Sequence, residues 1–145
     1  MDLDELRAML GNRRDYGWMA PKFVPVSADD GHVIVHADVT IDHVNLAKNL
    51  HGGAGATLVD VIGTLAIIGA DRWNRYGVST DLNVSWLAPI PLGETAVVDA
   101  RVLKIGRSMA FVEVEIRRAS DDVLCLQGRL TKSLGDPPPP VAGSA

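Results

Sequence analysis

The sequence predicts an α+β fold: a curved, mostly antiparallel sheet of about five strands, wrapped around one long central helix. Three observations predict it. The segment 52–70 is apolar on nearly every side, as is typical of a helix enclosed by other structure. A strand-like alternation of apolar and polar residues precedes this segment. Four more strand-like segments follow it, joined by short turns. Because no crossover helices separate these four, they form an antiparallel sheet, and the apolar helix packs against its concave face.

Length and composition indicate a single globular domain. A chain of 145 residues fits one domain, and 47% hydrophobic with 22% charged residues argues against intrinsic disorder. The formal net charge of −4 excludes the broad basic surface that nucleic-acid binding requires. The single cysteine, Cys125, excludes a disulfide framework and a cysteine-rich zinc site. The acidic N-terminus does not resemble a signal peptide, so we expect a soluble, cytoplasmic protein.

We divide the chain into a lead-in (1–32), a folded domain (33–135) and a proline-rich tail (136–145) that we expect to be disordered. Residues 3–10 predict a short amphipathic helix at the periphery. Residues 33–41 predict the first strand, because apolar residues occupy every second position. Its inward side chains are Val33, Val35, Ala37, Val39 and Ile41.

The apolar segment 52–70 also invites a membrane interpretation, which we reject. It is close to the roughly 20 residues that span a bilayer, but Asp60 near its centre would cost several kcal/mol, about 2–4 on common scales. Its five glycines also weaken it as a free-standing helix. We therefore expect the buried helix of a soluble protein and no membrane span.

Four strands are predicted after the helix, over residues 79–86, 95–105, 109–118 and 123–134. The first of them ends before Pro89 and Pro91, which cannot donate to a β-ladder. Residues 106–108 and 120–122 form the turns between the later strands. In the strand 109–118 the inward residues are expected to be Ala110, Val112, Val114 and Ile116, with Glu113, Glu115 and Arg117 outward.

The candidate catalytic residues lie between Asn45 and Asp60. His51, Gly52 and Gly53 stand where a loop enters the helix, and the unpaired N–H groups of a helix start can hold an oxyanion. Asp60 follows about two and a half turns later, among apolar neighbours. A carboxylate kept in such surroundings is a candidate base or nucleophile beside a possible oxyanion site.

Structural interpretations of the same residues stay open. Asp60 also fits a structural carboxylate at a strand cap or a subunit interface, and His51 fits a residue that only begins the helix. The glycines also fit helix–sheet packing alone, and the polar residues of the strand 79–86 fit an ordinary polar face. Cys125 is expected to be an inert core thiol. His32 and His36 lie on one strand without a third ligand, so we expect no metal site.

The segments NLAKNLHGGAGATLVD, GVSTDLNVSWLAPIPLGE, VLKIGRSMAFVEVEI and QGRLTKSLG resemble the hotdog-fold acyl-CoA thioesterases of the phenylacetate-pathway (PaaI) type. The resemblance covers residues 33 to 135. It implies a hotdog fold, in which a sheet wraps one long helix, and hydrolysis of acyl-CoA to a free carboxylic acid and CoA. It further implies a homodimer with shared active sites, assembled into a homotetramer.

Site residues also follow from this resemblance. It implies that Asp60 is the general base or nucleophile, that Ser79 positions the attacking water, and that the Gly52 N–H forms the oxyanion hole. Asn45 and His51 would orient the thioester carbonyl and the loop. In such enzymes the residues corresponding to 45, 51 and 52 come from one subunit, and those corresponding to 60 and 79 from its partner.

Coenzyme A, present only as part of the substrate, would bind two further segments, and no other cofactor is implied. The segments are Trp86, Leu87, Ala88, Pro89, Ile90 and Pro91, and Lys104, Ile105, Gly106, Arg107, Ser108 and Met109, with Lys132 and Ser133 towards the nucleotide end. Turn N–H groups and cations suit phosphate, and residues 101–132 carry seven basic and four acidic residues. Relatives of this type occur in bacterial cytoplasm and at mitochondria.

Two other functions remain as alternatives to hydrolysis. A non-hydrolytic acyl-CoA-binding protein would share the fold, but it would need neither Asp60 nor Ser79. A hydratase acting on 2-enoyl-CoA would need a different Asp and His pattern, so this alternative rests on fold analogy alone.

Overall fold

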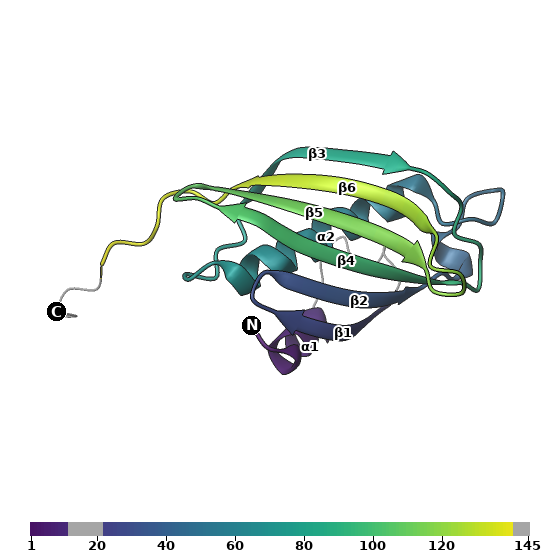
Figure 1. The fold of residues 1–145 in the computed structure, drawn as a ribbon, viewed down its shortest axis with the longest axis horizontal. Coiled ribbons are helices and arrows are strands. Elements are labelled where there is room, and N and C mark those ends of the chain that lie inside the picture. Colours follow the sequence, from purple (N-terminus) through teal and green to yellow (C-terminus); the bar gives the residue numbers. More distant parts are fainter. Residues whose placement is uncertain (12–21, 141–145) are drawn as a thin grey trace.

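The computed structural model describes residues 1–11 and 22–140, and these form one sheet with one long helix against it (Figure 1). The sheet has six antiparallel strands in the order β1-β2-β4-β5-β6-β3. The elements in chain order are α1 (Leu3–Gly11), β1 (Phe23–Asp29), β2 (His32–Asp38), the 3-10 turn η2 (Ile41–His43), α2 (Gly52–Ala70), β3 (Val78–Trp86), β4 (Thr95–Ile105), β5 (Met109–Arg118) and β6 (Leu124–Ser133). The predicted hotdog architecture is confirmed.

The sheet has one strand more than the five predicted, because β1 lies in the segment assigned to the lead-in. β1 forms a hairpin with β2, and the turn contains Gly31, whose φ of 73° suits glycine. Pro25 interrupts its sequence pattern, and Val24 and Val26 are 57% and 43% exposed. β1 is an edge strand, and edge strands tolerate proline and carry weak alternation.

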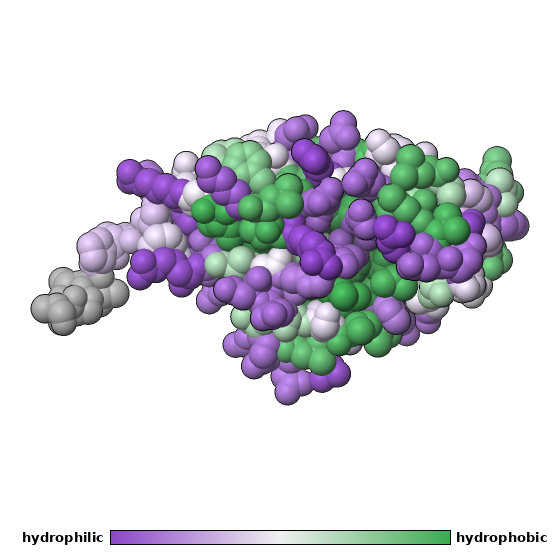
Figure 2. Space-filling model, in the orientation of Figure 1, coloured by the Kyte–Doolittle hydropathy of each residue, from purple (hydrophilic) through white to green (hydrophobic). Residues whose placement is uncertain are grey.

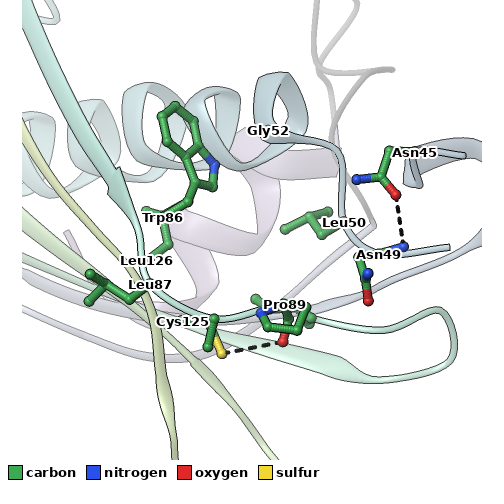
Figure 3. Close-up of a pocket in the computed structure, with 11 residues that line it drawn as sticks. Asn45, Asn49, Leu50, Gly52, Trp86, Leu87, Pro89, Cys125 and Leu126 are labelled. Carbon is green, nitrogen blue, oxygen red and sulfur yellow. Dashed lines mark hydrogen bonds between the residues drawn. The ribbon is translucent and has the colours of Figure 1, made fainter. Parts of the chain in front are cut away.

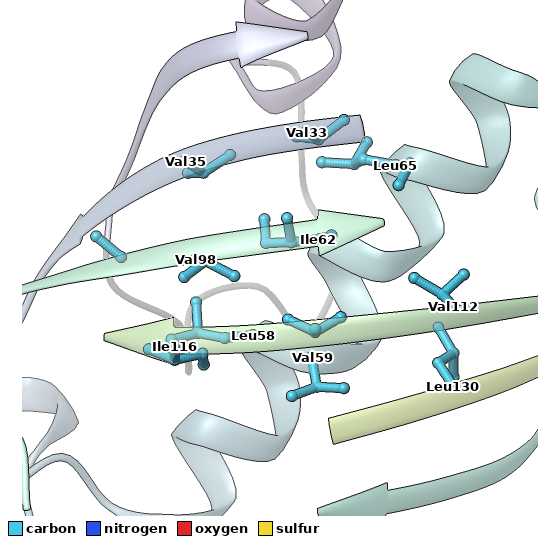
Figure 4. Packing of buried hydrophobic residues seen from close by; sticks show 14 of the residues in the cluster. Val33, Val35, Leu58, Val59, Ile62, Leu65, Val98, Val112, Ile116 and Leu130 are labelled. Carbon is cyan, nitrogen blue, oxygen red and sulfur yellow. The ribbon is translucent and has the colours of Figure 1, made fainter. Parts of the chain in front are cut away.

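α2 and the inner face of the sheet form the core (Figure 4). Leu58, Val59 and Ile62 of the helix are fully buried against the strands. Strand residues at alternating positions complete this core, and they include Val33, Val35, Ala37, Ala110, Val112, Val114 and Ile116. The prediction was wrong for Ile41, because β2 ends at Asp38 and Ile41 begins the turn η2, where it is 59% exposed. The burial of this helix and of one strand face therefore organises the domain.

The outer face of the sheet is polar at the alternate positions. Glu113 and Glu115 on β5 lie outward, and they pair in register with Arg101 and Asp99 on β4. Figure 2 shows hydrophilic residues spread across the molecule, with hydrophobic patches between them. This alternation agrees with the strand faces predicted from the sequence.

α1 is a short amphipathic helix at the periphery, as the sequence predicts, with most of its described side chains exposed. Its start is capped reciprocally: Asp2 Oδ1 accepts the backbone N–H groups of Asp4 and Glu5, and Glu5 Oε2 accepts that of Asp2. Leu6 is fully buried in the main hydrophobic cluster. In the tail, residues 136–140 form neither helix nor strand. The predicted disorder of 141–145 falls outside the described residues.

Among the described residues, α2 alone is long and apolar enough to cross a bilayer. Nine of its residues are buried, at positions that contact the strands: Ala54, Gly55, Leu58, Val59, Ile62, Gly63, Leu65, Ala66 and Ile67. The apolar sequence of α2 is therefore explained by its burial in the protein core.

The contact between α2 and β6 gives a testable prediction. A Cβ on Gly128 would lie 2.7 Å and 2.8 Å from the two methyl carbons of Val59, and a β-branched residue in a helix has one favoured rotamer. We expect Gly128→Ala to lower the free energy of unfolding by about 1–3 kcal/mol, as overpacking does. Denaturant unfolding measures this. Gly106→Ala is the control, because its Cβ would meet nothing closer than 3.6 Å; equal losses in both variants would contradict the packing argument.

Candidate functional site

The start of α2 presents backbone N–H groups at the surface. His51 is the N-cap, and its Nδ1 accepts the N–H of Gly53 at 2.9 Å. The backbone of His51 is itself fixed, because its N–H donates to the carbonyl of His43 at 2.8 Å. The N–H of Gly52 lies in the first turn, where a helix offers no internal acceptor. The sequence hypothesis of an oxyanion-binding helix start therefore fits the geometry.

The loop before α2 holds the side chain of Asn45 in a defined orientation. Its Oδ1 accepts the backbone N–H groups of Ala47 at 3.0 Å and Asn49 at 3.1 Å. Lys48, with a φ of 61°, allows the tight turn between them. With the Oδ1 engaged, the NH₂ group of Asn45 is the part of the amide that can donate to a ligand carbonyl.

Asn45 and Gly52 line one cavity of about 440 Å³, together with the connection from β3 to β4 (Figure 3). The indole of Trp86 stands against the helix start, since a Cβ on Gly52 would lie 3.6 Å from its ring. Five of the six residues predicted to bind CoA in this segment line the cavity: Trp86, Leu87, Ala88, Pro89 and Ile90. Pro91 adjoins it through a bridge to Asn49. The sequence thus predicted a set of residues that lie together.

Cys125 closes the inner wall of this cavity. Its Sγ is within hydrogen-bond distance of the carbonyls of Val123, at 3.2 Å, and Pro89, at 3.7 Å. The side chain is 1% exposed, and burial raises the pKa of the thiol. A thiol kept protonated in this way is a poor nucleophile, in agreement with the inert core role expected for it.

Asp60 and Ser79 form a second group. The hydroxyl of Ser79 on β3 donates to Oδ1 of Asp60 on α2 at 2.7 Å. Asp60 is half-buried and Ser79 is exposed, so the carboxylate keeps access to a ligand. The structure therefore brings together in one chain the two residues that the resemblance assigns to one subunit.

A second cavity, of about 320 Å³, adjoins Asp60. Its wall is mainly apolar, and Thr64 and Lys132 add polar groups to it. The ammonium of Lys132 donates to Oγ1 of Thr64 at 2.9 Å, and Lys132 is only 6% exposed. Burial lowers the pKa of Lys132, and the attraction of Asp60 acts in the opposite direction. The remaining lining residues are Met9, Val61, Leu65, Ile68 and Tyr76.

The two groups lie apart within one chain. Gly52 and Asp60 are eight residues apart on α2, which is about 12 Å along the axis at 1.5 Å per residue. One thioester carbonyl therefore cannot contact the Gly52 N–H and the Asp60 carboxylate of the same helix. Each chain therefore carries both halves of the site that the resemblance implies, the Gly52 group and the Asp60 group, but holds them too far apart to act on one thioester.

The second predicted CoA segment, 104–109, is the turn between β4 and β5. Met109 pairs in register with Ser133, and Ser133 pairs with Val78 at the start of β3. Trp86 is at the other end of β3, eight residues or about 26 Å away. Arg107 is exposed on this turn and forms an ion pair with Asp136 at 3.3 Å. Residues 104–109 and 133 thus lie far from the Trp86 cavity of their own chain.

A buried ion pair ties this turn to the end of α2. Asp71 follows the helix and accepts from the guanidinium of Arg75 at 2.8 Å. The hydrogen bond from Arg75 holds the pKa of the Asp71 carboxyl below its usual range. Arg75 also donates to the carbonyls of Arg107 and Gly135, at 2.9 Å each. These bonds fix the segment that carries Tyr76 into the second cavity.

Sequence reasoning missed several of the residues around Asp60. Thr64 stands four residues after Asp60, so helical periodicity already places it on the same face. Lys132 was assigned to CoA by its charge, whereas its side chain is buried beside Asp60. Met9 comes from another element, and no local pattern links it to the site.

The described residues contain no group of three or more His, Cys, Asp or Glu side chains placed to hold a metal ion. His32 instead bonds Asp99 through its Nε2 at 2.8 Å.

Comparison with known proteins identifies the family. The Thioesterase superfamily profile matches residues 47–125. Acyl-coenzyme A thioesterase 13 of Homo sapiens is 39% identical over 134 residues, covering 92% of this chain and 95% of the human protein. The crystal structure of zebrafish thioesterase superfamily member 2 aligns with a TM-score of 0.87 and 34% identity, over 93% of this chain and 99% of that one. The structure of smu.793 from Streptococcus mutans bound to acetyl CoA aligns with a TM-score of 0.76 and 26% identity, over 86% and 94%. The chain therefore belongs to the thioesterase superfamily.

Proposed function

We propose that this protein hydrolyses acyl-CoA thioesters to a free carboxylic acid and CoA, with each active site built from two copies of the chain. The observation that carries the proposal is the hydrogen-bonded pair of Asp60 and Ser79 beside a mainly apolar cavity. Family membership and a relative whose structure is described as bound to acetyl CoA support the substrate class.

The chemistry requires an oxyanion donor, a base and a water. The Gly52 N–H and the Asn45 NH₂ would donate to the carbonyl oxygen of the thioester. Asp60 would take a proton from water held by Ser79, and the hydroxide formed would attack the carbonyl carbon. As the tetrahedral intermediate collapses, the C–S bond breaks and the sulfur leaves as thiolate, which then takes up a proton. In an alternative with the same residues, the Asp60 carboxylate attacks the carbonyl carbon, the C–S bond breaks and the CoA thiolate leaves. Water then hydrolyses the resulting anhydride to the free acid and restores the Asp60 carboxylate.

Two copies related by a two-fold axis would complete the site. Ala56 is midway between Gly52 and Asp60 on α2, so antiparallel helices that cross near Ala56 would bring Gly52 of one copy to Asp60 of the other. β3 supports this arrangement because it is an edge strand with eight of its nine residues exposed. Its exposed apolar side chains include Val78 at 70%, Leu82 at 41% and Trp86 at 55%.

The same axis accounts for the two distant CoA segments. Antiparallel pairing of two β3 strands about Leu82 would place the Trp86 end of one copy beside the Val78 end of the other. The turn 104–109 of the second copy is next to that end of β3 through the Ser133 pairings. The exposed Lys104 and Arg107 would then supply cations near a CoA molecule that begins at the Trp86 cavity of the first copy.

Replacing the carboxylate of Asp60 tests the hydrolysis. We expect Asp60→Asn to lower kcat/KM by about 100-fold or more, as loss of a general base does. Thiol release is measured with a chromogenic reagent on phenylacetyl-, benzoyl-, hexanoyl- and palmitoyl-CoA. Because Cys125 is buried, the signal reports CoA.

Asp30→Asn is the matched control, since Asp30 is an exposed carboxylate in the β1–β2 turn, at the far edge of the sheet from β3. We expect this control to keep the wild-type rate. A wild-type protein that binds CoA and hydrolyses none of the four substrates would instead favour the non-hydrolytic binding protein. Equal rates for wild type and Asp60→Asn would exclude Asp60 from the chemistry.

Mixing two inactive variants tests the shared site. In a mixed dimer of Asp60→Asn and Asn45→Ala, one of the two sites receives both intact residues. If the chains are co-expressed in equal amounts, half of the dimers are mixed, so we expect about a quarter of the wild-type activity. Each variant alone, assayed at the same total concentration, sets the baseline. Activity of the mixture equal to the mean of the two variants would mean that each site is contained in one chain.

A further inference from the structure

Lys132 occupies a position where the fold calls for an apolar side chain. Along β6, Leu126, Gly128, Leu130 and Lys132 alternate on the face that packs against α2, and all four are buried. Burying an ammonium group is costly unless it is compensated by charge and hydrogen bonds. The hydroxyl of Thr64 supplies a hydrogen bond to the ammonium, but it is neutral. The compensating negative charge must therefore come from another residue.

Asp60 is the one carboxylate among the described residues that line this cavity. It lines the same cavity as Lys132, and its charge favours the protonated form of the lysine. Two strands and a helix converge here: Lys132 pairs in register with Ser79, and the Ser79 hydroxyl donates to Asp60 at 2.7 Å. The other titratable group that lines the cavity is Tyr76, which is 69% exposed.

Thr64 connects the two charged residues on the helix side. Its hydroxyl donates to the backbone carbonyl of Asp60 at 2.6 Å, so the lone pairs of Oγ1 are left to accept from Lys132 at 2.9 Å. The ammonium is thereby fixed one helical turn from the carboxylate. A buried ammonium held by such a hydrogen bond is pre-organised and does not have to move when a ligand binds.

We propose that Lys132 is a positioning residue of the hydrolysis: its buried ammonium stabilises the ionised Asp60 carboxylate in the place where the base is required. The inference rests on the proposed function. It gives Lys132 a role in the chemistry of the Asp60 group, in place of the CoA contact that the sequence suggested.

The pH dependence of catalysis distinguishes this role from a structural one. Lys132→Met keeps an unbranched, largely apolar side chain and removes the charge, so Asp60 must ionise without this cation. We expect the acid limb of the kcat/KM profile to move to higher pH by about one unit. The loss is expected mainly in kcat, to be largest at acid pH and to fade as pH rises. Lys22→Met, at an exposed site before β1, is the matched control. An unmoved limb in a Lys132→Met protein that melts like the wild type would overturn the proposal.

A second measurement does not depend on activity or on that variant. The chain has four lysines, and the Lys132 side-chain signal in NMR can be identified by its contact with Thr64. Because coupling between two charges is reciprocal, Asp60→Asn should move the Lys132 titration to lower pH and leave the other lysines unchanged. A Lys132 titration that is the same in the wild type and in the Asp60→Asn variant would overturn the proposal, whether or not the protein hydrolyses any substrate. Absence of hydrolysis in the wild type would contradict only the proposed function.

Discussion

The enclosure of α2 is the constraint on which the rest of the structure depends. The helix is apolar around most of its circumference, and a single sheet covers one side of it. α1 adds cover through the fully buried Leu6, which anchors this peripheral helix to the core. The face that carries Asp60 stays half-open beside a cavity. The carboxylate of Asp60 therefore lies on the part of α2 that the rest of the described chain does not fully cover.

The same geometry makes one chain insufficient for the proposed chemistry. The helix start supplies N–H donors, and a residue more than two turns later supplies the carboxylate; a rigid helix cannot fold back to join them. The exposed edge strand β3 and the exposed apolar side chains along it occur on the side where a second copy would join them. Oligomerisation and catalysis would then depend on the same surface.

Patterns of local origin allowed much of this to be predicted from sequence. Alternation in the strand 109–118 and the all-apolar segment 52–70 identified the core, and the family resemblance grouped Asn45 with Gly52. β1 was not predicted, because this edge strand contains Pro25 and shows little alternation of apolar and polar residues. The burial of Lys132 was not predicted, although Leu126, Leu130 and Lys132 share one face of β6 and this phase was visible in the sequence. The cavity partner Met9 depends on tertiary packing, which no local pattern contains.

The buried ammonium and the half-open carboxylate also bear on how the proposed site would respond to substrate. An acyl group that entered the cavity beside Asp60 would exclude water from around the two charges, and the attraction between them would strengthen as the local dielectric constant fell. Without Lys132, the same loss of water would disfavour the anion and promote its protonation at the moment when a base is required. The lysine thus offsets a desolvation penalty that substrate binding itself creates. For that reason its effect should be greater in the substrate complex, which kcat reports, than in the free enzyme.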